Sequence, residues 1–250
     1  MNLLTLLKAE FNKHNLGVVW LIAIGIPVGT SGIMLLDMLL RYNNYLRDLT
    51  QKNGVSSWEM LLNESHRVLG WGMFIPLFIA LIATIIHYVE IEGDNWKKLL
   101  AFPVLRGEIY LAKLIAIVFF SFVMITLNTV GLIMVGKIIG FSEPINYDLY
   151  GGYIFRQYGA ILGVAALHNL FSIISKSAIK PVVMGFMGML ITPAIISKSE
   201  LIGKLIPYAY TYNVDGLKNI DPLFGAFAGI IAMIIISIVG IFYFSKRDMV

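Results

Sequence analysis

Long apolar runs separated by short polar segments dominate the pattern of this chain. Most of these runs reach the roughly 17 to 25 residues that cross the hydrocarbon core of a bilayer as a helix. None alternates between apolar and polar positions with a period of two, as a strand of a membrane barrel would. The pattern therefore predicts an all-α integral membrane protein with six spans in a single domain over residues 1–250. The predicted spans are residues 16–40, 69–89, 114–136, 150–174, 181–197 and 223–245.

The composition agrees with a lipid environment. Of 250 residues, 58% are hydrophobic and 14% are charged, whereas a soluble domain usually carries about 25% charged residues. A soluble globule is therefore excluded. The chain has no cysteine, which excludes disulfides, thiolate metal sites and a cysteine nucleophile. A net charge of +4 is typical of topology signals and lipid headgroup contact, so we expect membrane lipid, and no nucleic acid, as a partner.

Basic residues between the spans indicate the orientation. Taken together, the segments before the first span, between the second and third, between the fourth and fifth, and after the last have a higher density of basic residues than the other connecting segments, and Lys246 and Arg247 directly follow the last apolar run. Because basic loops stay on the cytoplasmic side, we expect a multi-pass protein of the cell membrane with both termini in the cytoplasm.

Two segments outside the spans carry local helix signals. Residues 1–15 predict an amphipathic helix that either lies in the cytoplasmic leaflet or extends the first span inward. Its apolar face holds Leu3, Leu4, Leu7 and Phe11. In the loop 41–68, Ser56 and Glu59 have the spacing of a capping box, which predicts a short outer helix.

The densest charge cluster lies between the second and third spans. Gly93-Asp94 could supply a turn and an N-cap for a short helix through Trp96, which Pro103 would end. Such a helix, with an aromatic anchor, could fit a groove on a soluble partner. A solvated loop with ordinary topology signals is equally compatible. The charges are Glu90, Glu92, Asp94, Lys97, Lys98, Arg106, Glu108 and Lys113.

Residues 76–113 resemble the second span, coupling helix and start of the third span of ABC-2-type transporter permeases. The resemblance is strongest to the bacteriocin- and lantibiotic-immunity and peptide-toxin exporter branch, such as permeases that export phenol-soluble modulins or bacitracin. It rests on the Gly93-x-x-Trp96 turn, Pro103 and the run Ile109–Lys113. The order of an amphipathic helix followed by six spans extends the resemblance to the whole chain. His87, Tyr88 and Arg156 depart from it.

The resemblance implies an ATP-driven ABC exporter of amphipathic or antimicrobial peptides, or of another hydrophobic cargo. Two permease chains, identical or related, would sit on two copies of an ABC ATPase that binds ATP and Mg. The chain has no G-x-x-x-x-G-K-[ST] phosphate loop, so we expect no catalytic residue, metal or cofactor in it. Residues 90–106 would couple to the ATPase. The implied coupling residues are Glu90, Glu92, Asp94, Trp96, Lys97, Lys98, Leu99 and Arg106.

The region 198–222 is broken by prolines and glycines, and its tyrosines suit an aromatic belt at the outer interface. The resemblance implies a broken helical hairpin that closes the outer side of the pathway, whereas an ordinary loop is the simpler interpretation. The residues assigned to this outer gate are Pro207, Tyr208, Tyr210 and Tyr212.

Polar residues within the spans admit two interpretations. Asn128, His168 and Asn169 could line a pathway or hydrogen-bond between helices, and packing is the simpler role. Gly25, Gly29 and Gly32 in the first span have the spacing that lets two helices approach closely, which predicts a contact between two chains.

Two other classes of membrane protein are weaker alternatives. An ATP-independent channel or secondary transporter would be expected to show carboxylates inside the spans or an internal repeat. The acid within the predicted spans is Asp37, near the outer end of the first. An intramembrane enzyme would need a constellation such as Gly-x-Ser-x-Gly with a histidine, and the sequence has none.

Overall fold

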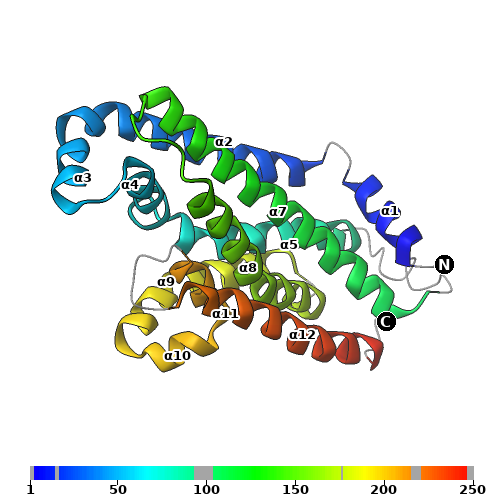
Figure 1. Ribbon diagram of the computed structural model, residues 1–250. Coiled ribbons are helices and arrows are strands. Elements are labelled where there is room, and N and C mark those ends of the chain that lie inside the picture. Colours follow the sequence, from blue (N-terminus) through cyan, green and yellow to red (C-terminus); the bar gives the residue numbers. More distant parts are fainter. Residues whose placement is uncertain (1–2, 15–16, 93–103, 176, 215–220, 247–250) are drawn as a thin grey trace.

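The computed structural model describes residues 3–14, 17–92, 104–175, 177–214 and 221–246, and throughout this part of the chain the regular elements are helices (Figure 1). Six are long and apolar enough to cross a membrane. This confirms the predicted all-α fold with six spans. The long helices are α2 (Val18–Arg41), α5 (Trp71–Glu92), α7 (Arg106–Ile139), α8 (Tyr147–Ser175), α9 (Ile179–Lys198) and α12 (Pro222–Lys246).

Short helices gather at the two ends of this bundle. Helix α1 (Leu3–Lys13) lies at the same end as the last residues of α12, whereas the other short elements lie at the opposite end (Figure 1). We call these the α1 end and the outer end. The short elements at the outer end are η1 (Tyr42–Leu46), α3 (Arg47–Asn53), α4 (Ser57–Asn63), η2 (Glu64–Val68), α10 (Glu200–Leu205), α11 (Pro207–Tyr210) and η3 (Thr211–Asn213).

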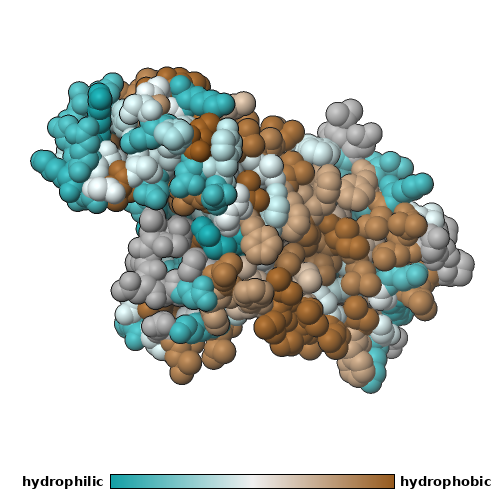
Figure 2. Space-filling view, viewed as in Figure 1, coloured by the Kyte–Doolittle hydropathy of each residue, from teal (hydrophilic) through white to brown (hydrophobic). Residues whose placement is uncertain are grey.

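Helices α5, α7 and α8 form the centre of the bundle. More than half of the apolar window in each is buried, against less than a quarter in α2, α9 and α12. Hydrophobic residues cover the middle of the visible face, and hydrophilic residues lie toward its ends (Figure 2). This distribution is that of a bundle whose peripheral helices face lipid or another chain, because exposed apolar surface of this size is unstable in water.

The closest helix pair is α8 and α12. A β-carbon at Gly229 would overlap the carbonyl oxygen of Gly159, and one at Gly159 would lie 2.7 Å from the Cα atom of Ala226. Small residues at a helix contact let the two backbones approach, which provides the packing that lipid cannot drive by hydrophobicity alone. Glycines on α8 and α12 therefore fix the last span against the centre.

Local signals in the sequence correspond to observed helix ends. The Ser56 hydroxyl accepts from the Glu59 amide at 3.2 Å, and the Glu59 carboxylate accepts from the Ser56 amide at 3.3 Å. This reciprocal pair is the predicted capping box at the start of α4. At the other end of the bundle, α1 stops at Lys13 and α2 begins at Val18, so α1 is a helix of its own that packs on α7.

Candidate functional site

Four charged side chains from three helices meet at the α1 end, and we call them the charge cluster: Glu10 and Lys13 of α1, Glu90 of α5 and Lys113 of α7. The Lys113 ammonium lies 2.6 Å from Glu90 Oε2 and 3.3 Å from Glu10 Oε2. The Lys13 ammonium lies 2.7 Å from Glu90 Oε1 and 2.9 Å from Glu10 Oε1. Each carboxylate thus contacts both ammonium groups, and the two negative charges balance the two positive ones.

Burial makes this balance necessary. The Lys113 side chain is 0% exposed, those of Glu90 and Glu10 are 2% and 4% exposed, and Lys13 is 30% exposed. An isolated charge in such a place is strongly unfavourable, so buried charges persist when they are paired and hydrogen-bonded. Lys113 is also satisfied by the carbonyl oxygen of Ile86, at 3.2 Å. The cluster thus joins α1, α5 and α7.

The two ionisable groups at the end of α1 respond differently to this setting. Burial by itself lowers the pKa of Lys13, but the carboxylates of Glu10 and Glu90 outweigh it and raise the pKa above its usual value. Burial also lowers the pKa of His14, whose Nε2 lies 4.0 Å from Glu10 Oε2. At neutral pH, Lys13 is charged and His14 is neutral.

The structure gives the implied coupling residues different environments. Glu90 is buried in the charge cluster, whereas Glu92 is exposed at the last position of α5. Arg106 begins α7, and its guanidinium donates to the carbonyl oxygens of Phe244 and Ser245 at 3.3 and 3.4 Å, which satisfies groups left open at the end of α12. Asp94, Trp96, Lys97, Lys98 and Leu99 lie outside the described residues.

Sequence reasoning did not assign a role to Glu10, Lys13 or Lys113. Glu10 and Lys13 lie within the amphipathic segment 1–15, and Lys113 is one of the charges in the cluster between the second and third spans. A signal was nevertheless present, because Lys113 falls inside a continuous helical run with apolar residues on both sides. An ionisable residue at such a position needs a partner.

A second polar contact connects the three central helices. His87 Nε2 lies 2.8 Å from Asn169 Oδ1, and the amide of Asn169 donates to the carbonyl oxygen of Tyr110 at 3.3 Å. All three residues are fully buried. Elsewhere, the Asn128 amide donates to the Thr30 hydroxyl at 3.1 Å and so links α7 to α2. Both asparagines thus hydrogen-bond across helices.

His168 of α8 and Tyr208 of α11 meet, although the sequence suggested separate roles for them. The Tyr208 hydroxyl lies 2.8 Å from His168 Nε2, and its ring fits against Gly188 of α9, where a β-carbon would clash with it. Burial raises the pKa of Tyr208, so the hydroxyl keeps its proton and can donate. Tyr208 therefore reaches from α11 to a buried side chain of α8.

The remaining residues of the expected aromatic belt have different partners. Pro207 occupies the first turn of α11, where its missing N–H has no intrahelical role. Tyr210 is 7% exposed and packs edge-on against Phe224 of α12. The guanidinium of Arg67 lies over the ring of Tyr212, 5.8 Å from its centroid. The three tyrosines thus fasten α11 and η3 to several helices.

Comparison with known protein families gives a match over most of the chain. A family model described as ABC-2 family transporter protein matches residues 6–192, which is more than half of the chain and includes the charge cluster. No curated protein matches the chain. Members of the family generally pair with an ABC ATPase. The chain therefore belongs to the ABC-2 family of transporter proteins, as the multi-pass membrane subunit of an ABC transporter.

Proposed function

We propose that this chain is the membrane half of an ATP-driven exporter that moves amphipathic peptides, antimicrobial peptides among them, or another hydrophobic cargo out of the cell or the membrane. ATP and Mg would be bound by two copies of the partner ATPase. The observation that carries the proposal is the charge cluster, because it joins three helices beside the segment expected to contact that ATPase.

The segment 90–106 is held at both of its ends. Glu90 lies in the charge cluster with α1 and α7, and Arg106 contacts the end of α12. Buried ion pairs are expensive to separate. A displacement of the segment by an ATPase would therefore move α1, α5, α7 and α12 together, which is what coupling of hydrolysis to transport requires.

An apolar groove supports the proposed cargo class. The groove lies between α11 and α12 and has almost no polar side chains, so it suits an apolar chain or helix face rather than a small charged solute. Its lining residues are Leu167, Leu205, Pro207, Tyr210, Phe224, Phe227, Ala228, Ile231, Ala232, Ile235 and Ile236. This apolar lining supports a cargo that enters from the bilayer.

A second permease chain would contact α2. A β-carbon placed at Gly25, Gly29 or Gly32 would have no atom within 4 Å, so this small-residue face is open for close approach by another helix. A cysteine at Gly29 should form crosslinks between two chains in membranes, whereas one at Phe155, which is exposed on α8, should not. Crosslinking at Phe155 alone would place the interface elsewhere.

The test of the function is co-purification with the ATPase encoded beside the gene, followed by ATPase measurement with added peptides. Trp96→Ala and Lys97→Glu should leave the permease in the membrane but lose the ATPase, because the proposed coupling segment would bind through an aromatic anchor and a few charges. Lys52→Glu, at an exposed lysine of α3, is the matched control and should retain it. Full ATPase retention in all three variants would contradict the coupling role, and absence of any ATPase partner would contradict the exporter.

A further inference from the structure

The segment Pro207–Val214, which we call the outer segment, consists of two very short helical turns, α11 and η3. Short helices leave the carbonyl groups at their ends without partners inside the helix. Here those carbonyls belong to Tyr212 and Val214. Val214 is fully buried and Tyr212 is half-buried, so the buried Val214 carbonyl needs a donor from elsewhere in the fold.

Two side chains from distant parts of the chain supply these donors. Arg156 Nε of α8 donates to the Val214 carbonyl oxygen at 2.6 Å, and His66 Nε2 of η2 lies 3.2 Å from the Tyr212 carbonyl oxygen. Because a carbonyl can only accept, Nε2 carries the proton. In the neutral ring, Nδ1 then accepts from the Tyr153 hydroxyl at 2.8 Å.

Further hydrogen bonds join the outer segment to α5 and α8. The Thr211 hydroxyl donates to the carbonyl oxygen of Gly72 in α5 at 2.9 Å, and Tyr208 contacts His168 of α8. Toward α12 the contact consists of the rings of Tyr210 and Phe224 and a close approach of the Tyr210 carbonyl to Gly225. Hydrogen bonds have narrow ranges of distance and angle, so the bonds to α5, α8 and η2 help to set the position of the outer segment.

We propose that Arg156 and His66 are positioning residues that hold the outer segment in its closed place at the outer end of the bundle. The inference rests on the proposed function, together with the resemblance, which implies that the region 198–222 closes the outer side of the pathway. It explains why a charged residue interrupts the start of the fourth span: Arg156 donates to the carbonyl of the buried residue Val214, directly after η3. Moving the segment outward requires both carbonyls to exchange these donors for water.

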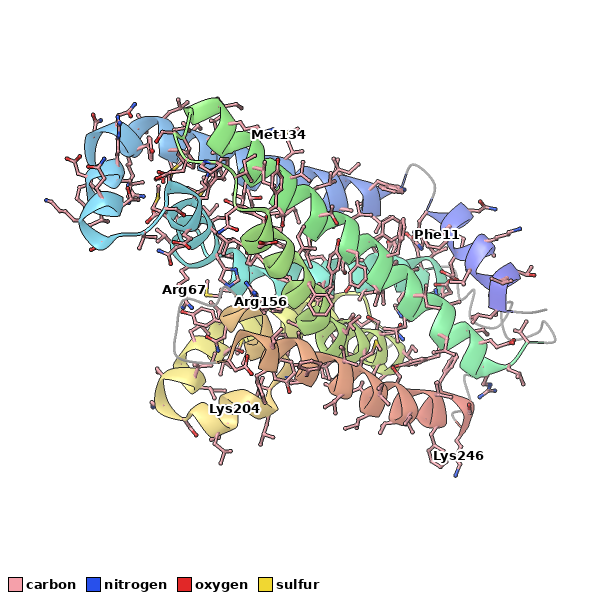
Figure 3. The ribbon with its side chains drawn as sticks, in the orientation of Figure 1. Phe11, Arg67, Met134, Arg156, Lys204 and Lys246 are labelled. Atoms are coloured by element: carbon pink, nitrogen blue, oxygen red, sulfur yellow. The ribbon has the colours of Figure 1, made fainter. Side chains whose placement is uncertain are left out.

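The test uses the full-length chain in nanodiscs, without ATPase or cargo, so its outcome is independent of whether the exporter proposal holds. Ala209→Cys in α11 is the reporter, because Ala209 is 4% exposed and the chain has no native cysteine. In Arg156→Met or His66→Phe, the rate of maleimide labelling should rise about tenfold, since a carbonyl of the outer segment loses its donor. Arg156 is labelled in Figure 3.

Conservative variants and a second reporter separate positioning from general destabilisation. His66→Gln and Arg156→Lys retain a donor and should restore most of the slow labelling. Ala165→Cys, fully buried in α8, should stay unreactive in every variant. Unchanged labelling at Ala209 in both Arg156→Met and His66→Phe, or equal acceleration at Ala165, would overturn the proposal. If Arg156→Met does not yield monodisperse protein, the His66→Phe and His66→Gln pair decides the outcome in the same way.

Discussion

Replacement of Lys113 by methionine is the sharpest test of the charge cluster. Methionine keeps most of the length and apolar stem of lysine, so the change removes the ammonium and little else. The ammonium contacts two carboxylates, at 2.6 Å from Glu90 and 3.3 Å from Glu10. After the substitution, Lys13 alone faces both carboxylates, and one buried negative charge has no counterpart.

The expected cost follows from this imbalance. Breaking a buried ion pair by removal of one partner costs about 3 to 5 kcal/mol, because the other charge stays buried. Adding Glu90→Gln removes the surplus charge and leaves Glu10 paired with Lys13 at 2.9 Å. The double variant should therefore be more stable than Lys113→Met alone, although it has lost one more charged group.

Equilibrium unfolding in mixed micelles, followed by tryptophan fluorescence, measures these free energies. Lys137→Met, at an exposed lysine of the same helix, is the matched control and should change the free energy of unfolding by less than about 0.5 kcal/mol. Should Lys113→Met be as stable as the parent, or the double variant less stable than the single one, the reasoning from charge balance would be refuted.

Three further outcomes are expected. Gly159→Leu should abolish folded protein in membranes, since any side chain there meets the backbone of α12, whereas Gly151→Ala, in open space, should be tolerated; size-exclusion chromatography checks both. Because burial lowers the pKa of His14, stability is retained above the ordinary histidine pKa of about 6.5 and lost as the pH falls below it. Faster hydrogen exchange of α1 at acidic pH would show this, and His14→Gln should flatten the response. Finally, cysteines at the exposed positions Asn53 and Lys246 should react with an impermeant maleimide in intact cells at Asn53 only; the reverse pattern would invert the topology.

The sequence was sufficient to predict the number of spans, because a bilayer demands a minimum length of apolar helix and excludes unpaired backbone within it. It also determined the capping box at Ser56 and Glu59, whose two hydrogen bonds join residues three positions apart. These features depend on neighbours along the chain or on the lipid around it, so no knowledge of helix pairing is needed to see them.

The polar residues that meet are known only from the way the helices pack. Glu90 lies 23 positions before Lys113 and Glu10 lies 103 before it, and Tyr208 follows His168 by 40; no spacing rule predicts pairs so far apart. Glycines illustrate the same limit. Both α2 and α8 carry glycines at helical spacing, yet Gly159 meets another helix and Gly29 faces open space. A periodic pattern defines a face of a helix, but only the packing of all six spans determines which face is covered.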